Sequence, residues 1–253
     1  MAKHKSIDTV EADMNLSIGK EKVSLRVSVE AGLTSPATLL KFVQAFSDKT
    51  VQIAVNNSLE EGKTISCKKG CGACCAQLVP VTEVEIRHIA LLIKGLPMER
   101  KQLIMTRFDQ ARSKLHTAGL WQQLINPATF DEQDIIHFGL TYFELGIYCP
   151  FLIDDACSIH ADRPIACREY LVTSDAQYCA QPRAEKIEGV SIPIRLSAVL
   201  GRLCEADCHH HADWVPLILA PYWQSLHPNQ PTKKTGQQWV ELFLEKLTDM
   251  SKE

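Results

Sequence analysis

The segment 67–75 reads CKKGCGACC and places four cysteines within nine residues, two of them adjacent. Thiols at this density oxidise or react unless a bond occupies them. The segment therefore needs disulfides, a redox pair or a metal ion. The whole chain contains ten cysteines, and their spacing constrains the protein more than any other feature of the sequence.

Composition and charge exclude several classes of protein. The chain has 253 residues, of which 45% are hydrophobic and 23% charged, as in a folded protein with an ordinary core. The formal net charge of −3 provides no basic field, so we expect no nucleic-acid partner. The longest apolar run, 214–223, is too short for a membrane span and is interrupted by Pro216 and Pro221. We therefore expect no membrane partner either.

The cellular compartment of the protein determines whether its thiols are expected to form disulfides. The N-terminal residues 1–15 lack the apolar core of a secretory signal, which predicts a cytoplasmic protein. Cytosolic reductants keep thiols reduced, so a framework of disulfides is not expected. A cysteine pattern in a cytosolic chain is more typical of metal binding or catalysis.

One segment alternates as a strand does. Residues 22–30 place four apolar side chains on one face, which predicts a half-buried strand. A strand needs a partner, and residues 189–196 alternate in the same way. Pro193 would restrict that second strand to a sheet edge. We therefore expect 22–30 to pair with 189–196.

Most of the remaining chain has apolar residues at helical spacing. Ser35-Pro36 marks one helix start, and Thr82 with Glu85 forms a capping box at another. Helices are expected from Pro36, over 82–95, from Pro97 to Gly119, from near Asp131, and over 196–208, 214–226 and 237–249. The sequence thus predicts a mainly α fold: a helical bundle-like single domain with a small two-stranded β element and cysteine-rich metal-binding loops.

The expected domain organisation has three parts. Residues 1–21 are polar and weakly patterned, and we expect a frayed N-terminal lead-in. Residues 22–226 form the domain, with its core motif at 67–180. Residues 227–253 add a loop and a C-terminal helix packed on that domain.

Eight of the cysteines avoid the amphipathic helices and lie in two loops. The first loop contributes Cys67, Cys71, Cys74 and Cys75, and the second Cys149, Cys157, Cys167 and Cys179. Helices that fold back antiparallel would bring the two loops together. Two loops that converge on one point form a tetrathiolate site, so we expect these eight residues to bind metal.

The spacing narrows the choice of metal without deciding it. Thiolates suit zinc, iron–sulfur clusters and copper(I). Three close cysteines with a remote fourth, and a Cys-Pro such as Cys149-Pro150, are typical of iron–sulfur ligation, including 4Fe-4S clusters. Neighbouring side chains are expected to point apart, so Cys74 and Cys75 predict either two centres or one spare thiol. Eight thiols satisfy two four-coordinate sites, or one cubane cluster and one zinc ion.

The cysteine pattern resembles the zinc- or iron-chelating cysteine-cluster family often called YkgJ-like. That family has a C-x3-C-x2-C-C cluster followed by a C-P-F-L…C-x-I-Y…R-P-x-x-C-R block, which stands here as CPFLIDDACSIHADRPIACREY. The match covers about residues 67–180 and implies chelation of zinc or iron, without a settled biochemical activity. His160 stands where the pattern has Tyr. We expect His160 to hydrogen-bond, with metal ligation as the alternative.

Two arginines flank Cys167. Arg163 and Arg168 are candidates to offset the negative charge of a tetrathiolate centre or to donate to its sulfur atoms. A tetrathiolate around Zn²⁺ carries a net negative charge, which favours this role. The alternative is surface ion pairs with aspartates of the same loop, namely Asp154, Asp155 or Asp162.

A second group of donors reads CEADCHHH at 204–211. Cys204 and Cys208 would share one helical face, and His209 follows them directly, so the three are candidates for an additional metal site. The group lies outside the family pattern, and consecutive histidines cannot all face one ion. The sequence therefore weighs against a native site here.

Three functions are compatible with these residues. The first is a metal-binding protein that chelates zinc or iron. The second is an iron–sulfur redox or radical enzyme, or a methyltransferase-type enzyme: Cys67, Cys71 and Cys74 have the spacing of radical S-adenosylmethionine enzymes, and a flagellin lysine methylase belongs to the wider family by resemblance. The third is a zinc-braced module for protein interaction. The chain lacks common hydrolase, metalloprotease and nucleotide-binding motifs, so the sequence names no catalytic residue, substrate or protein partner.

Overall fold

Helices form most of the fold, as their periodicity predicted. The computed structural model describes residues 8–125, 132–181, 186–205, 214–228 and 232–250. The α-helices are α1 (Leu40–Glu60), α2 (Glu83–Gly95), α3 (Met98–Thr117), α4 (Trp121–Leu124), α5 (Glu132–Glu144), α6 (Ile165–Glu169), α7 (Leu196–Glu205), α8 (Trp223–Leu226) and α9 (Gly236–Met250). Short 3₁₀ helices are η1 (Pro36–Leu39), η2 (Ala73–Ala76), η4 (His160–Asp162), η5 (Ala176–Ala180) and η7 (Leu217–Leu219).

Every sheet in the described part of the chain is an antiparallel pair of strands. The strands are β1 (Thr9–Ile18), β2 (Glu21–Glu30), β3 (Leu33–Thr34), β4 (Pro80–Val81), β5 (Leu152–Ile153), β6 (Ala156–Cys157), β7 (Val215–Pro216) and β8 (Lys234–Thr235). The pairs are β1 with β2, β3 with β8, β4 with β7, and β5 with β6. The mainly α fold is therefore confirmed, with more small β elements than predicted.

The strand expected at 22–30 is present as β2, and its alternating residues Val23, Leu25, Val27 and Val29 are buried. Its predicted partner was wrong. β2 pairs with β1, from Thr9↔Glu30 to Ile18↔Glu21, so residues 9–18 are a strand and not the frayed lead-in expected at 1–21. Of the 189–196 segment, Gly189 forms only an isolated bridge with Val172.

The short connection between β1 and β2 explains why β2 pairs with β1. Two residues, Gly19 and Lys20, close the β1–β2 hairpin, and Gly19 has the positive φ of +59° that such turns require. A connection this short brings the strands together at little entropic cost. Most of β1 is exposed, so its polar sequence lacks the alternation that identifies β2.

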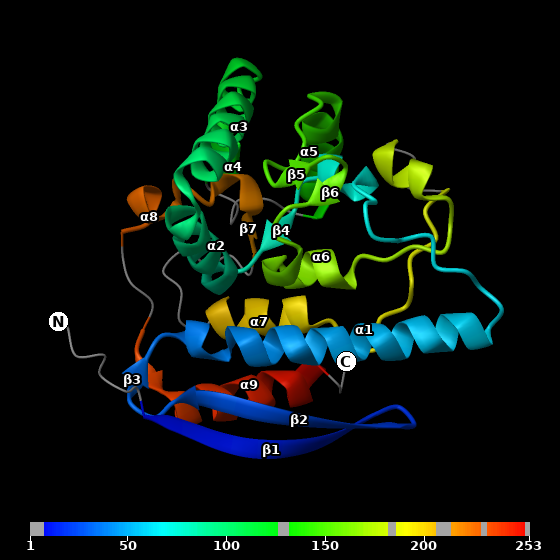
Figure 1. Ribbon diagram of the computed structural model, residues 1–253, viewed down its shortest axis with the longest axis vertical. Helices are drawn as coiled ribbons and strands as arrows, with labels where there is room; N and C mark the ends of the chain where they lie inside the picture. Colours follow the sequence, from blue (N-terminus) through cyan, green and yellow to red (C-terminus); the bar gives the residue numbers. More distant parts are fainter. Residues whose placement is uncertain (1–7, 126–131, 182–185, 206–213, 229–231, 251–253) are drawn as a thin grey trace.

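Two helices pack on the hairpin. α1 and α9 contact β2, and α7 packs against these two helices on the side away from the strands (Figure 1). The Trp239 Nε1–H donates to the Thr34 carbonyl oxygen at 2.9 Å, which fixes α9 to the end of the hairpin. The helix predicted over 237–249 is confirmed by α9, and the helix predicted over 196–208 is confirmed as α7 up to Glu205.

The helix predicted over 214–226 was wrong. This stretch forms β7, η7 and the single turn α8. Pro216 and Pro221 explain the interruption, because proline lacks an N–H donor and its ring clashes with the preceding helical turn. Pro216 instead ends the strand β7, which pairs with β4 just before α2.

The capping box predicted at α2 is confirmed. The Glu85 backbone N–H donates to Thr82 Oγ1 at 3.4 Å, and the Thr82 backbone N–H donates to the Glu85 carboxylate at 2.9 Å. The following helix α3 ends before Gly119, whose φ of +73° is the left-handed conformation expected after a helix end.

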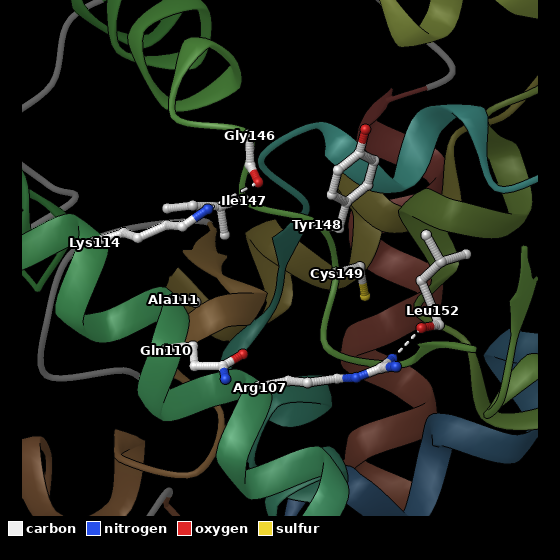
Figure 2. A pocket seen from close by; sticks show the side chains of 9 residues that line it. All are labelled: Arg107, Gln110, Ala111, Lys114, Gly146, Ile147, Tyr148, Cys149 and Leu152. Carbon is white, nitrogen blue, oxygen red and sulfur yellow. Dashed lines mark hydrogen bonds between the residues drawn. The ribbon is translucent and has the colours of Figure 1, made fainter. Parts of the chain in front are cut away.

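Two arginines of α3 hold the β5–β6 hairpin. Arg107 donates to the Leu152 carbonyl oxygen (Figure 2), and Arg100 donates to the Ser158 carbonyl oxygen. Asp154 and Asp155 make the turn between the strands, with φ of 48° and 57°. Positive φ at both central residues is the requirement of a type I′ turn. The hairpin that carries Cys157 is thus defined by its turn and by α3.

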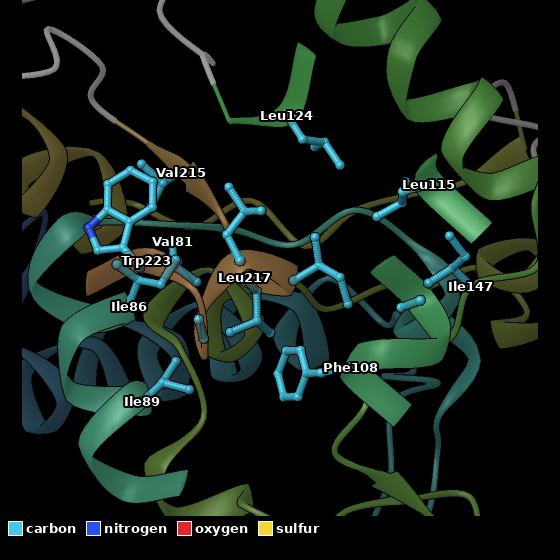
Figure 3. Close-up of a cluster of buried hydrophobic side chains, with 14 of the residues drawn as sticks. Val81, Ile86, Ile89, Phe108, Leu115, Leu124, Ile147, Val215, Leu217 and Trp223 are labelled. Carbon is cyan, nitrogen blue, oxygen red and sulfur yellow. The ribbon is translucent and has the colours of Figure 1, made fainter. Parts of the chain in front are cut away.

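The buried apolar side chains form two large clusters. The first lies among α2, α3, α5 and the β4–β7 pair (Figure 3) and includes Ile86, Phe108 and Trp223. The second joins the β1–β2 hairpin to α1, α7 and α9 and includes Phe46 and Trp239. α6 lies between them (Figure 1), because it contacts α1 and α7 on one side and β4 on the other.

Within the described residues, none of the helices combines the length and the apolar character needed to cross a membrane.

Candidate metal centre

The two cysteine-bearing loops meet directly. The Cys149 backbone N–H donates to the Cys75 carbonyl oxygen at 2.7 Å. η2, which carries Cys74 and Cys75, also packs against η5, which carries Cys179. Segments that are far apart in sequence are therefore joined at the cysteines.

Gly72 permits the close approach of the two loops. A Cβ atom at Gly72 would lie 2.5 Å from Leu152 Cδ1 and 3.1 Å from the Asp155 carbonyl oxygen. A side chain here would turn the Leu152 side chain away and crowd the backbone of the β5–β6 hairpin at Asp155. The φ of Gly72 is −100°, which any residue adopts, so the reason for glycine at this position is packing.

The eight loop cysteines are free thiols, with Cys179 buried and the others half-buried. Their electrostatic interactions define two groups of neighbours. Cys179 is influenced by Cys74, Cys67 and Cys71, whereas Cys167 is influenced by Cys149, Cys74 and Cys157. Cys74 belongs to both sets of neighbours and therefore lies at the centre of the thiol cluster.

The side chains of Cys74 and Cys75 do not diverge, contrary to the expectation from their adjacency. The two thiols are neighbours, and the interaction with Cys75 is the main reason that the pKa of Cys74 is raised. Both residues lie in the 3₁₀ helix η2. Successive side chains in a 3₁₀ helix are separated by about a third of a turn, not by the half turn of a strand.

Burial strongly affects the acidity of the other thiols. It raises the pKa of Cys149 to about 12, and the pKa of Cys167 lies well above its usual range for the same reason. Burial is likewise the main cause of the raised pKa values of Cys67, Cys157 and Cys179. These thiols hold their protons at neutral pH, so binding of a metal ion must displace protons.

Arg163 is the cation whose charge acts on several thiols of the cluster. Its positive charge opposes the rise in the pKa of Cys67, Cys74 and Cys157. Its buried Nε atom has no hydrogen-bond partner among the described residues. A cation in this position stabilises thiolates, which is the effect predicted for it from the sequence.

Arg168 behaves differently from the prediction. Its guanidinium donates to both carboxylate oxygens of Asp48, at 2.8 and 2.9 Å, and to the Arg163 and Ala161 carbonyl oxygens. The ion pair is thus formed with α1 and not with an aspartate of the cysteine loop. Arg168 is buried, and its hydrogen bonds hold the backbone of the loop and not the sulfur atoms.

Of the remaining candidate donors, His160 stands apart from this cluster. His160 is exposed in η4, and the charge of Arg163, followed by burial and Arg168, lowers the pKa of the imidazole. No cysteine is among the described electrostatic neighbours of His160. Cys208 and His209 lie outside the described residues, and of Cys204 the structure describes only the helical backbone at the end of α7.

Glu85 supports the site in a way that the sequence did not predict. Besides capping α2, the buried carboxylate accepts the Ile165 backbone N–H at 2.7 Å. This bond fixes the start of α6, two residues before Cys167. The capping box identified the residue but not its contact across the fold, because that contact depends on tertiary structure.

Gln77 and Tyr170 were also missed by the sequence analysis. The Gln77 Nε2–H donates to the Tyr170 hydroxyl and to the Cys179 carbonyl oxygen, both at 3.2 Å. The Tyr170 hydroxyl lies 4.0 Å from Cys179 Sγ. These two side chains connect η2 to the segment that carries Cys179. The R-P-x-x-C-R-E-Y run places Tyr170 three residues after Cys167, which is the only sequence signal for it.

The chemistry of the donors fits a thiophilic metal. Eight thiols, two contacting loops and a neighbouring cation suit zinc or iron, which accept thiolate ligands. Among the described residues, no three Cys, His, Asp or Glu side chains already stand in coordinating positions. The thiols must therefore lose protons and rotate before they can close around an ion.

The fold and this thiol cluster define a mainly helical protein with a cysteine-lined centre suited to metal chelation. Residues 66–185 match the family model CxxCxxCC, described as a putative zinc- or iron-chelating domain. This stretch matches the kind of cysteine-cluster domain that the resemblance over 67–180 predicted. The match supports binding of a metal, zinc or iron. The searches of curated proteins and of solved structures gave no match.

Proposed function

We propose that this protein binds zinc or iron through the eight cysteines of its two converging loops. The observation that carries the proposal is the hydrogen bond from Cys149 to Cys75, which joins the 67–75 and 149–179 segments. Thiols that far apart in sequence meet in one place only if the fold brings them there. The family match supports the same conclusion.

The thiols fall into two groups of neighbours, which favours two metal sites over one. Cys67, Cys71 and Cys179 form one group, and Cys149, Cys157 and Cys167 form the other. Cys74 is an electrostatic neighbour of both groups, and Cys75 is a neighbour of Cys74. We assign one of these two thiols to each group, which gives four thiols per site. A tetrathiolate set is the usual environment of structural zinc and of iron–sulfur clusters.

Other residues of the chain prepare these groups for binding. Arg163 offsets negative charge as thiolates form, Glu85 holds the segment before Cys167, and Gln77 with Tyr170 holds the segment at Cys179. When bound, the metal would supply a link between the two loops and, in the case of iron–sulfur clusters, a redox centre.

The radical-enzyme hypothesis receives no support from the architecture. Enzymes of that kind place their three-cysteine motif in a βα barrel, which needs parallel strands. The sheets within the described ranges are all antiparallel pairs. Metal binding itself, without an assigned reaction, is therefore the function that the site supports best.

Anaerobic purification of the untagged chain tests the proposal. We expect two loaded sites per chain, as eight thiols allow: about two zinc ions by elemental analysis, or, for iron–sulfur clusters, about four irons per cubane cluster together with visible charge-transfer absorbance. Cys67→Ser and Cys167→Ser should each empty one site, and Cys74→Ser should empty one site as well. Cys204→Ser, outside the two loops, is the matched control. A metal-free wild-type chain, or equal losses in the control, would refute the proposal.

A further inference from the structure

A cavity opens beside the cysteine cluster, between α3 and residues 146–152 (Figure 2). Its volume is about 280 Å³. Arg107, Gln110 and Lys114 line it from α3, and Cys149 lines it from the opposite segment. This space, which we call the α3 cavity, is smaller than the pockets of drug-sized ligands, which begin near ~300 Å³. It suits a small metabolite.

Polar side chains of α3 give the cavity a regular pattern of donors. Arg107, Gln110 and Lys114 stand three and seven positions apart and share one helical face. The Cα atoms of the two cationic residues are therefore separated along the helix axis by about 10 Å, with an amide side chain between them. Such an arrangement matches a ligand with an anionic group at each end.

The positive charge of the cavity is not neutralised by acidic side chains of the described residues. Among the described residues, none that lines the cavity carries a carboxylate. Arg107 donates to the Leu152 carbonyl oxygen, and Lys114 donates to the Leu145 and Gly146 carbonyl oxygens at 3.4 and 3.3 Å. A guanidinium has five N–H donors and an ammonium has three, so both cations retain donors for a ligand.

We propose that the α3 cavity binds a small dicarboxylate of about four to six carbons, a size that suits a cavity below the drug-sized range. One carboxylate pairs with Arg107, the other pairs with Lys114, and Gln110 contacts the middle of the ligand. Guanidinium–carboxylate pairs are the strong, charge-assisted hydrogen bonds of proteins. The phosphate ion shares the negative charge but cannot reach both cations.

The position of Cys149 connects this cavity to the metal centre. Cys149 is one of the proposed ligands, and its side chain lines the same space (Figure 2). Carboxylates also bind zinc and iron, so a dicarboxylate in the cavity would lie beside the metal, where it can deliver or exchange the ion. That step rests on the proposed function, whereas binding of the anion itself does not.

Calorimetric titration of succinate into the metal-free full-length chain tests the inference. The titration is made anaerobically with dithiothreitol, because the common phosphine reductant is itself a tricarboxylate. We expect succinate to bind, succinamide to show no binding, and phosphate to bind at least about tenfold more weakly, since each lost charge-assisted bond costs about 1.4 kcal/mol or more.

Variants of α3 locate the binding site. Lys114→Gln should weaken succinate binding about tenfold, as expected for one lost charged partner. Gln110→Glu places a negative charge between the two cations and should abolish binding. Lys101→Gln is the matched control, because it removes one charge from the same helix outside the cavity. Circular dichroism verifies that each variant keeps its helical content.

Several results would overturn the inference: no heat of binding for succinate, equal affinities for succinate and phosphate, or equal effects of Lys101→Gln and Lys114→Gln. The outcome is independent of the metal proposal. Lys114-dependent binding of succinate to a chain that retains no metal after anaerobic purification would support the cavity and refute the metal centre. Metal binding without succinate binding would do the reverse.

Discussion

At the scale of single residues, the candidate metal ligands are thiols whose burial keeps them protonated. Burial raises the pKa of Cys149 to about 12 and also raises the pKa values of Cys67 and Cys157. Arg163 opposes the rise at Cys67 and Cys157. The metal-free centre is thus a set of protonated thiols beside one cation, and uptake of an ion is an exchange of protons for metal.

This exchange predicts a pH dependence. Because the pKa values are raised, the thiols are protonated at neutral pH, and a fall in pH favours the metal-free form. The affinity for zinc should therefore rise with pH between about 6 and 8, by up to tenfold per pH unit for each proton released. Competition with a chromophoric chelator at several pH values measures it. Titrations in buffers of different ionisation enthalpy count the protons, and a count of zero would contradict the interpretation.

Glu85 leads to a second prediction for a single residue. One carboxylate oxygen accepts the Ile165 N–H at 2.7 Å and the other accepts the Thr82 N–H at 2.9 Å. In Glu85→Gln an NH₂ group must face one of these donors, so we expect a loss of about 1–3 kcal/mol in the free energy of unfolding. Urea unfolding measures the loss. Glu99→Gln, in the exposed first turn of α3, is the control, and an equal loss there would remove the special role of Glu85.

The residue types of the site were predictable, whereas their partners were not. Cysteine spacing identified the candidate thiols, and the charge of Arg163 suggested its effect on them. The contacts of Glu85 with Ile165 and of Arg168 with Asp48 span 80 and 120 positions. No local pattern of one sequence encodes such contacts, because they arise from the packing of separate elements.

At the scale of elements, the turn at η2 and the β5–β6 hairpin form the framework of the site. The hairpin is held by its positive-φ turn and by Arg107, and Gly72 allows η2 to contact it. Helix periodicity predicted most helices correctly because the buried face repeats along each one. It failed at 214–226, where prolines interrupt the pattern, and it offered no information on the partner of β2.

Gly72→Ala tests this framework. The added Cβ would meet Leu152 Cδ1 at 2.5 Å and the Asp155 carbonyl oxygen at 3.1 Å, so the Leu152 side chain must turn and the hairpin backbone must give by a few tenths of an ångström. We expect a loss of about 1–3 kcal/mol in stability, as for overpacked cores, together with weaker metal retention against a chelator. Both are measured by thermal unfolding and by metal release.

Gly139→Ala is the matched control for that variant. Gly139 lies in α5, and a Cβ there would meet no atom within 4 Å. Alanine is the better helix former, so this change should stabilise the protein by up to about 1 kcal/mol. Equal behaviour of the two variants would show that the contact at Gly72 has no consequence.

At the scale of the whole molecule, α6 connects the thiol cluster to both hydrophobic clusters. The first residue of α6 is Ile165. Its backbone N–H donates to the Glu85 carboxylate, and its side chain packs in the cluster of the β1–β2 hairpin. At the last residue of α6, the Glu169 carboxylate accepts the Leu196 N–H at 2.6 Å and so holds the start of α7. Cys149 and Cys157 pack against the other cluster. Two thiols thus pack directly against the first cluster, whereas the cluster of the β1–β2 hairpin is connected to the thiols through α6. We therefore expect metal binding to be coupled more closely to the first cluster.

Hydrogen–deuterium exchange of the metal-loaded chain, with and without a chelator, tests this unequal coupling. A structural zinc contributes on the order of 10 kcal/mol to folding, which is comparable to the stability of a domain. We expect metal removal to increase exchange over 66–81 and 147–180, with a smaller increase at the start of α7. The β1–β2 hairpin and α9 should stay protected, because their side chains pack in a separate cluster. Cys71→Ser, which removes a proposed ligand of one site, should reproduce the increase over 66–81 and near Cys179, and Cys204→Ser should not. An increase spread evenly over the chain would mean that the two clusters unfold as one unit, and no increase at all would mean that the metal does not hold the loops together.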